Sequence, residues 1–287
     1  MSQRVEAALE SAIAHAELGA APPLLAAAVR HAVFSGGARV RPQLCLAIAQ
    51  ACGDDQPGLA DAAAAAIEML HCASLAHDDL PCFDDAATRR GRPSVHALFG
   101  APLAVLAGDA LIVLAFDTLA RAGVAAPGRL PGLMSTIVRG VGMPSGIVAG
   151  QAWESEPSPP VAAYHSAKTG ALFVAATMSG ALAAGSDPAP WRTLGETLGS
   201  AYQVADDLAD AVLSEADLGK PTGQDAAHHR PSLVTELGLM GAYDRLQDLV
   251  RAATDSIPDC NGADDLRKLV RLQATRLAPK SLSRSAA

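Results

Sequence analysis

The sequence predicts an all-α protein, a single large helical bundle around a central cavity. Half of its 287 residues are hydrophobic, yet only 3% are aromatic, and alanine and leucine dominate the apolar runs. These two residues favour helices, whereas strands are enriched in β-branched and aromatic side chains. Short turns rich in glycine and proline divide the chain into helix-length runs. We therefore expect about ten or more helices in one bundle.

The whole chain, residues 1–287, is predicted to be one domain. No linker, low-complexity segment or repeat interrupts it, and the connections between helical runs are too short to separate domains. The formal charge of −8, without a basic stripe, argues against nucleic acid as a partner. The five cysteines are odd in number and scattered, which indicates reduced thiols in a cytoplasmic protein.

The N-terminal run, MSQRVEAALESAIAHAEL, reads as an amphipathic helix without the basic start and apolar centre of a signal peptide. After a second helical run, the segment GGARVRP places Arg39 and Arg41 behind two glycines. Two guanidinium groups can grip a diphosphate. A helix start with solvated arginines would leave the same pattern, so the residues alone leave both interpretations open.

A long helical run leads to the first acid cluster. Residues 62–79 contain neither glycine nor proline, and the proline at position 81 disfavours helix at the residue before it. The helix should therefore end or distort just after Asp78 and Asp79. That break would let the chain curl back and bring Asp84 beside Asp78. His71 lies about two turns below Asp78 on the same face, as a core residue or a ligand.

Two later helical runs contain polar residues. The most apolar long run, Pro102 to Ala120, is interrupted by Asp109 and Asp117. We therefore expect a buried helix there, and no transmembrane segment. Further on, Lys168 lies in a helical run between alanine-rich turns, where a lysine can be an ordinary side chain that reaches the surface.

The second acid cluster, in AYQVADDLAD, holds Asp206, Asp207 and Asp210. Asp206 and Asp210 are four residues apart and share one helix face, so no break is needed here. Either cluster alone would also fit a solvated helix end. Two clusters facing one cavity, with Arg89 and Arg90 behind the first, indicate instead a site that binds a diphosphate through bridging Mg²⁺ ions.

These motifs resemble those of the trans-isoprenyl diphosphate synthases. DDLPCFD and the arginine pair after it are similar to that family's first aspartate-rich motif, and DDLAD is similar to its second. GGARVRP, AKTGALF, YQVADD and LGKPTGQD stand in the family's order, so the resemblance covers nearly the whole chain. The WES after Gln151 and the RPS after His229 most resemble bacterial geranylgeranyl diphosphate synthases of carotenoid and photosynthetic pigment pathways.

The resemblance implies an isoprenoid-synthase bundle that binds about three Mg²⁺ ions with the allylic diphosphate and that forms a homodimer. The metal ligands that it implies are Asp78, Asp79, Asp84, Asp206, Asp207 and Asp210. The substrate-binding residues that it implies are Arg41, His71, Arg89, Arg90, Lys168, Thr169, Gln203, Lys220 and Arg230. Of these, Lys168, Thr169 and Gln203 would also act in catalysis, near the carbon that ionises.

Two positions depart from the family's pattern. Ala38 stands where the family has a lysine that binds isopentenyl diphosphate, and the neighbouring Arg39 is expected to replace that lysine in part. Arg230 stands where the family has another lysine, and the proline after it should change the local backbone.

The reaction that the resemblance implies is head-to-tail condensation of isopentenyl diphosphate with an allylic diphosphate. Ala73 and Ser74, just before Asp78, are small, whereas in this family large aromatic side chains near these positions stop growth at C15. A C20 product, geranylgeranyl diphosphate, is therefore expected. The alternatives are a C15 farnesyl diphosphate synthase and a regulatory, non-catalytic subunit. A class I terpene cyclase is a further rival, but DDLAD and GGARVRP argue against it.

Overall fold

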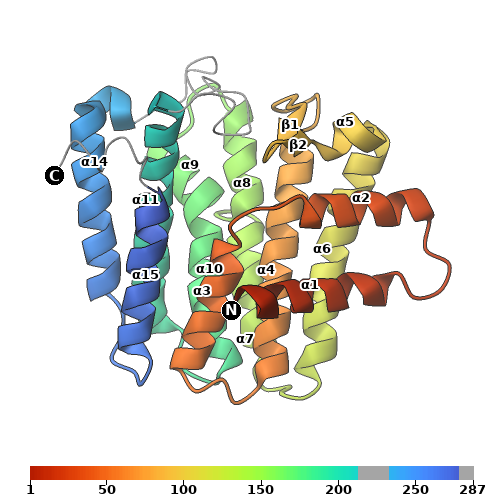
Figure 1. The fold of residues 1–287 in the computed structure, drawn as a ribbon, viewed down its shortest axis with the longest axis horizontal. Helices are drawn as coiled ribbons and strands as arrows, with labels where there is room; N and C mark the ends of the chain where they lie inside the picture. Colours follow the sequence, from red (N-terminus) through yellow and green to blue (C-terminus); the bar gives the residue numbers. More distant parts are fainter. Residues whose placement is uncertain (213–232, 278–287) are drawn as a thin grey trace.

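A computed structural model describes residues 1–212 and 233–277 of the chain, and these residues form a bundle of α-helices (Figure 1). The prediction of an all-α fold is confirmed. The first half contains α1 (Ser2–Ala16), α2 (Pro23–Phe34), α3 (Val40–Ala51), α4 (Pro57–Asp78), α5 (Val95–Phe99) and α6 (Ala101–Gly123). The second half contains α7 (Leu130–Val141), α8 (Ile147–Ala152), α9 (Val161–His165), α10 (Ala171–Ala183), α11 (Arg192–Val212), α14 (Leu233–Asp255) and α15 (Ala263–Leu277).

Short elements join these helices. They are the two-residue strands β1 (Thr88–Arg89) and β2 (Arg92–Pro93), the 3-10 turns η1 (Trp153–Ser155) and η3 (Ala189–Trp191), and the π-helical turn η2 (Ser166–Gly170). The strands pair antiparallel, with Arg89 opposite Arg92. Arg90 and Gly91 connect them with φ angles of 54° and 73°. A two-residue hairpin turn of type I′ requires positive φ at both positions, and glycine adopts it without strain.

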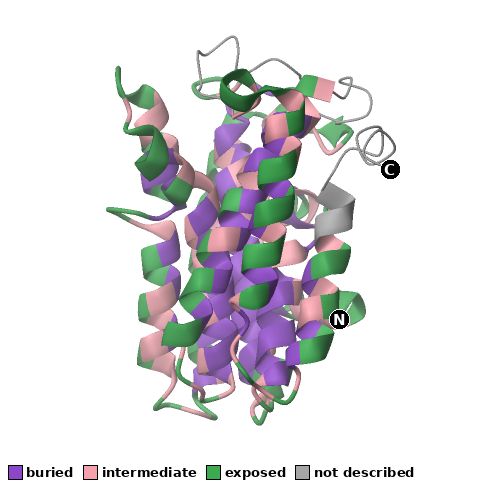
Figure 2. Ribbon diagram, turned by 90° about the vertical axis from the view of Figure 1, so that its left-hand side faces the viewer, coloured by how far each residue is buried: buried purple, intermediate pink, exposed green. Residues whose placement is uncertain are grey.

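Helix α4 lies at the centre of the bundle. It packs against α3, α6 and α10, and α1 and α2 cross over it and α6 (Figure 1). Residues 62–70 of α4 are all buried, most of them alanines, and the buried interior runs along the length of the bundle (Figure 2). Small side chains let neighbouring helices approach closely. A Cβ added to Gly180 on α10 would lie 2.4 Å from the carbonyl oxygen of Cys45 on α3.

Ion pairs fasten the N-terminal helices to this core. Arg4 on α1 donates to Asp61 on α4 at 2.5 Å. Arg39, which precedes α3, pairs with Glu6 at 2.9 Å and with Glu68 at 2.8 Å. The Arg39 side chain is only 4% exposed, so its charge is held within the fold.

Helix α6 is not the buried helix that the sequence predicted. Its inner face belongs to the core, but Val105, Leu106 and Val113 are 41%, 51% and 69% exposed. Among the described residues, α4 and α6 are both long and apolar enough to cross a membrane by length and composition alone. For α4, 83% of that apolar stretch is buried inside the bundle, against 39% for α6. Helix α4 is therefore a core helix, whereas α6 keeps an apolar face at the surface.

Candidate active site

The first acid cluster lies where α4 ends. The helix stops at Asp78 and the chain then turns back, so that the Asp84 N–H donates to the Asp78 carbonyl at 3.0 Å and the Ala86 N–H donates to the Asp79 carbonyl at 3.2 Å. The prediction that Asp84 returns to Asp78 is confirmed. The proline at position 81 explains the break, because it disfavours helix at the residue before it.

The second acid cluster lies on α11, toward the same end of the bundle as the end of α4 (Figure 1). A cavity of about 210 Å³ opens between the two clusters. The predicted site residues that line it are Arg41, His71, Ser74, Asp78, Asp84, Arg89, Lys168, Thr169, Gln203, Asp206 and Asp210. Most of the predicted residues therefore surround one cavity, and they come from α3, α4, the segment after α4, η2 and α11.

Some predicted residues lie elsewhere. Asp79, Asp207, Arg90 and Ala73 do not line this cavity. Ala73 is 1% exposed and belongs to the hydrophobic core, whereas its neighbour Ser74 faces the cavity. Lys220 and Arg230 lie outside the described residues.

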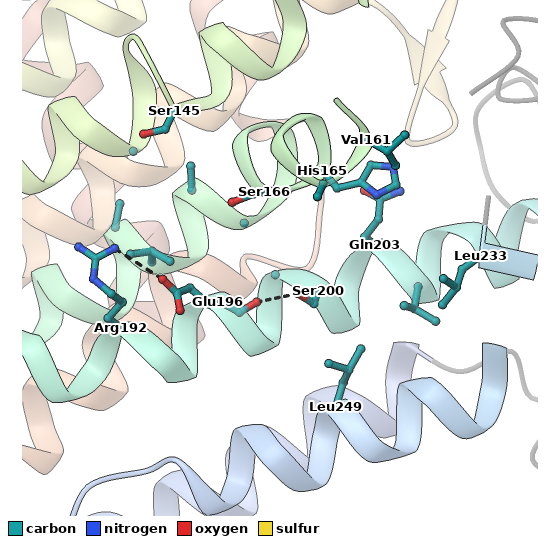
Figure 3. A pocket seen from close by; sticks show the side chains of 18 of the residues that line it. Ser145, Val161, His165, Ser166, Arg192, Glu196, Ser200, Gln203, Leu233 and Leu249 are labelled. Carbon is teal, nitrogen blue, oxygen red and sulfur yellow. Dashed lines mark hydrogen bonds and ion pairs between the residues drawn. The ribbon is translucent and has the colours of Figure 1, made fainter. Parts of the chain in front are cut away.

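A larger cavity, of about 790 Å³, also has Gln203 in its wall (Figure 3). It is lined by parts of α7, α9, η2, α10, α11 and α14, and Asp207 faces it. It contains neither Asp78 nor Asp206, and none of the first-cluster arginines. The smaller cavity, which is lined by Asp78, Asp206 and Arg89, is therefore the candidate active site.

Asp78 is crowded by other charges. Gln151 donates to one carboxylate oxygen at 3.2 Å, and the Lys168 ammonium lies 3.8 Å from the other. Burial raises the pKa of Asp78; Lys168 opposes that shift, and the negative charges of Asp84 and Glu154 add to it. A cation beside Asp78 would relieve this crowding, as expected of a metal ligand.

The carboxylates fit Mg²⁺, although they do not form a cage. Asp78, Asp84, Asp206 and Asp210 present hard oxygen donors to one cavity, which is the ligand type that Mg²⁺ prefers. No group of three or more His, Cys, Asp or Glu side chains in the described part of the chain is close enough to hold a metal ion by itself. This is the arrangement expected where phosphate oxygens of a substrate complete the coordination.

Asp79 was predicted to bind metal, but its carboxylate is buried and paired with Arg89. It is 2% exposed, and Arg89 donates to its Oδ1 through Nε at 2.9 Å and also through Nη2. Burial raises the pKa of Asp79, and Arg89 opposes that shift. The carboxylate thus holds Arg89 at the cavity wall.

A second group of side chains is suited to an anion. Arg41 Nη1 and Arg90 Nη2 lie 3.5 Å and 3.4 Å from His71 Nε2. Burial, together with these arginines, lowers the pKa of His71 well below its ordinary value, so the ring is neutral. Arg41 lies over the Phe173 ring at 4.6 Å, and its buried Nε has no hydrogen-bond partner. Buried donors without partners are rare, and a diphosphate would satisfy this one.

Arg39 does not replace the missing lysine at position 38, contrary to the prediction. Its guanidinium is bound by Glu6, Glu68 and the Val33 carbonyl, away from the cavity. These partners are far from Arg39 in sequence, so the motif alone could not reveal them. Ala38 itself is exposed in the loop before α3.

Lys168 lies in the π-helical turn η2. Such wide turns are rare and frequently occur at functional sites. The ammonium donates to Glu154 in η1, and the Tyr164 hydroxyl donates to the same carboxylate oxygen at 2.6 Å. Glu154, Tyr164 and Gln151 were not among the predicted site residues. Glu154 belongs to the WES stretch that carries the family resemblance, but that motif alone did not indicate its contact with Lys168.

Hydrogen bonds link Thr169, Gln203 and Asp207 across two helices. The Thr169 hydroxyl donates to Gln203 Oε1 at 2.9 Å, and Gln203 Nε2 donates to Asp207 Oδ1 at 3.0 Å. The other carboxylate oxygen of Asp207 accepts the Leu233 N–H at the start of α14, at 2.7 Å. Asp207 is 3% exposed, and it was predicted to bind metal. Its placement behind Gln203 does not support that role.

Comparisons with known proteins agree with this site. Residues 22–266 match the family described as polyprenyl synthetase. The chain is 53% identical over 281 residues to a geranylgeranyl diphosphate synthase of Cereibacter sphaeroides, covering 98% of each protein. It is 51% identical over 277 residues to the protein of the same name from Rhodobacter capsulatus, covering 96% of each.

Solved structures share the fold. A geranyltransferase from Helicobacter pylori, in complex with magnesium and isoprenyl diphosphate, has a TM-score of 0.79 at 28% identity, over 95% of this chain and 96% of that one. A geranylgeranyl pyrophosphate synthetase from Pyrococcus horikoshii has a TM-score of 0.77 at 28% identity, over 97% and 96%. Two acid clusters in one cavity, a helical bundle and these matches along nearly the whole sequence lead to one conclusion: the chain belongs to the polyprenyl synthetase family.

Proposed function

We propose that this protein is a Mg²⁺-dependent prenyltransferase that condenses isopentenyl diphosphate head to tail with allylic diphosphates and makes geranylgeranyl diphosphate. The observation that carries the proposal is the cavity that joins both acid clusters to Arg41 and His71, with Arg90 beside the His71 ring. This reaction requires that one diphosphate be bound through metal ions and that a second be bound directly by side chains. The names of the two bacterial relatives support the C20 product.

The carboxylates of the cavity would hold the metal ions: Asp78 and Asp84 from one cluster, Asp206 and Asp210 from the other. When bound, Mg²⁺ supplies positive charge that stabilises the leaving diphosphate. The Helicobacter pylori relative was crystallised with magnesium, which supports this choice of ion. The number of ions, about three, is part of the proposal.

The residues of the chain bind, orient and protect the reacting groups. Lys168 donates to oxygens of the allylic diphosphate, whose charge grows as its C–O bond breaks. Thr169 and Gln203 place oxygen atoms where positive charge develops on the allylic carbon. A buried site of this kind excludes the water that would quench the cation.

Arg41, Arg90 and His71 hold isopentenyl diphosphate beside the allylic carbon, and its double bond attacks that carbon. The new C–C bond forms, and a proton is then lost to the released diphosphate. Orientation of two substrates in one cavity accounts for a large part of such rate enhancements. Lys220 and Arg230 are proposed as further diphosphate contacts on the evidence of their sequence positions.

Incubation of the purified protein alone with Mg²⁺, isopentenyl diphosphate and labelled farnesyl or geranyl diphosphate tests the proposal. Chromatography of the dephosphorylated products should show mainly the C20 alcohol. Product that stops at C15 would make the chain a farnesyl diphosphate synthase. No turnover without a partner chain would instead favour the regulatory subunit.

The chain-length proposal rests on the small residues below Asp78. Ser74 faces the cavity, and Ala73 lies behind it in the core. We expect Ser74→Phe or Ala73→Phe to shift the product to C15 by filling the space for the tail. A phenylalanine at the fully buried position 73 also risks overpacking, so the melting temperature of each variant is measured. A folded, active variant that still makes C20 would remove that position as the determinant.

The assembly that we propose is a homodimer of one-domain subunits in the cytoplasm. Helix α6 supports it, because Val105, Leu106 and Val113 form an apolar face that nothing within the described residues covers. Apolar faces of this kind mark protein or membrane contacts. Asp109 and Asp117 lie on the same face, and buried acids are costly in a lipid core, which favours a second protein subunit over lipid.

A further inference from the structure

Asp207 belongs to the second acid cluster, but it does not line the cavity where metal would bind. Its helix neighbours Asp206 and Asp210 line the candidate active site, whereas Asp207 lines the larger cavity behind Gln203. It is 3% exposed. A buried carboxylate needs donors around it, and two of these donors are Gln203 Nε2 and the Leu233 N–H.

The two donors determine how Asp207 can act on Gln203. The Leu233 N–H can only donate, so it fixes Asp207 Oδ2 as an acceptor. The remaining oxygen, Oδ1, is also only an acceptor, because a carboxylate has no hydrogen to give. Gln203 must therefore present its NH₂ group to Asp207, and it does so at 3.0 Å.

The amide oxygen of Gln203 consequently faces the active site. There it accepts the Thr169 hydroxyl at 2.9 Å, and a carbonyl oxygen has a second lone pair to offer. Gln203 and Thr169 both line the cavity, and in Figure 3 the Gln203 side chain rises from α11 toward the segment that carries Ser166. The two ends of an amide are almost the same size, so only the neighbours decide which end faces the cavity.

We propose that Asp207 is a positioning residue that holds Gln203 with its amide oxygen, rather than its NH₂ group, toward the allylic carbon. The inference rests on the proposed prenyl transfer. An oxygen dipole fixed in this way stabilises positive charge as it develops, and a reversed amide would oppose it. Asp207 acts through Gln203 and needs no contact with metal or substrate.

Asp207→Asn tests this orientation with almost no change in shape. The Leu233 N–H still needs an acceptor, so the amide oxygen of the introduced asparagine turns to it and the new NH₂ group faces Gln203. Gln203 must then flip to accept that hydrogen bond, which places its own NH₂ group toward the cavity. We expect kcat, measured as total isopentenyl incorporation, to fall about a hundredfold. The KM values and the half-saturating Mg²⁺ concentration should stay within about threefold of wild type.

The double variant Asp207→Asn with Gln203→Glu is the rescue. The introduced glutamate has the shape of glutamine but accepts at both oxygens, so it can receive the NH₂ group of the introduced asparagine and still present oxygen to the cavity. We expect kcat to recover about tenfold over Asp207→Asn alone. Gln203→Glu in the wild-type background places two carboxylates side by side and should be slower than the double variant. Failure of the rescue in a folded protein would overturn the proposal.

Asp206→Asn is the comparison for metal binding, because Asp206 faces the cavity. Mg²⁺ with inorganic diphosphate should raise the melting temperature of wild type and of Asp207→Asn equally, but that of Asp206→Asn less. If Asp207→Asn also loses this rise, or needs far more Mg²⁺ for turnover, then Asp207 is a metal ligand and the inference is wrong. This thermal measurement does not depend on turnover. An inactive wild type would refute the proposed function separately.

Discussion

At the scale of single residues, the cavity brings buried and half-buried carboxylates close together, which is unfavourable for the stability of the metal-free fold. Asp78 is buried near Asp84 and Glu154, and burial with these charges raises its pKa. A carboxyl group whose pKa is higher in the folded than in the unfolded protein binds more protons when folded. The stability of the metal-free protein therefore falls as pH rises through that window. The carboxylates that serve the proposed function therefore lower the stability of the metal-free protein.

Asp78→Asn should accordingly stabilise the metal-free protein while removing its activity. At pH 7 we expect a gain of about 0.5–2 kcal/mol in the free energy of unfolding, and a loss of about a thousandfold in turnover. Thermal and urea unfolding without Mg²⁺ provide the first measurement. Asp248→Asn, on the exposed surface of α14, is the control. A less stable Asp78→Asn protein would show that Lys168 and Gln151 already compensate the charge.

His71 gives a pH dependence of the opposite direction. Its pKa is lowered well below the ordinary value by burial and by Arg41 and Arg90. The unfolded chain therefore takes up a proton at this residue near pH 6.5 while the folded chain does not, and stability falls as pH drops below that point. We expect His71→Asn to flatten the fall in melting temperature between about pH 7 and pH 5.5. His15→Asn, at an exposed site on α1, should keep the full slope.

At the scale of elements, the active site depends on close backbone contacts that only glycine allows. A Cβ added to Gly150 on α8 would lie 2.3 Å from the Lys168 nitrogen and 2.4 Å from its Cα. Helix α8 thus presses directly against the π-helical turn that presents Lys168. Real Cβ atoms do not approach backbone so closely, so one of the two elements must move to admit a side chain.

Gly150→Ala should therefore separate α8 from η2 and destabilise the protein by about 1–3 kcal/mol. It should also lower kcat, although Gly150 lies outside both acid clusters. Gly58→Ala, in the first turn of α4 with no atom within 4 Å of the added Cβ, is the matched control. It should be neutral or slightly stabilising, because alanine favours helix over glycine. The melting temperatures and kcat values of the two variants, each compared with wild type, test this prediction. Equal behaviour of the two variants would contradict the tight contact.

The elements that could be predicted from the sequence are those fixed by local rules. A proline near the end of α4 predicted the break, and the four-residue spacing of Asp206 and Asp210 predicted their shared face. The partners of Asp79, Arg39 and Asp207 could not be predicted, because they depend on contacts between distant segments. The motif identifies a residue as part of the acid cluster, but only the packing decides whether it faces the cavity or a neighbouring donor.

At the scale of the whole molecule, the exposed face of α6 is the feature that the sequence did not predict. Asp109 and Asp117 predicted a buried helix rather than a membrane span, but both lie on the outer face together with Val105, Leu106 and Val113. Helix α6 is therefore apolar on two faces. One side packs in the core, and we propose that the other meets a second subunit.

Val113→Asp should weaken that assembly, since it buries a charge in the proposed contact. We expect light scattering after gel filtration to show twice the mass of one chain for wild type, and about one chain for the variant at micromolar concentration. Val124→Asp, 80% exposed just beyond α6, is the control and should leave the mass unchanged. A wild type with the mass of one chain would refute the dimer. Recovery of the wild type with lipid vesicles would point to a membrane contact instead.

The turn that returns Asp84 to Asp78 also contains Cys82, which is exposed. The other cysteines are less accessible: Cys45 and Cys72 are buried, and burial raises the pKa of both thiols to about 12. Thiol reagents react with the thiolate at accessible sites, so a maleimide dye should label Cys82 first. The chain thus provides its own attachment point for a fluorophore between two proposed metal ligands. Its emission would report loading of the site in real time, without radioactive substrate.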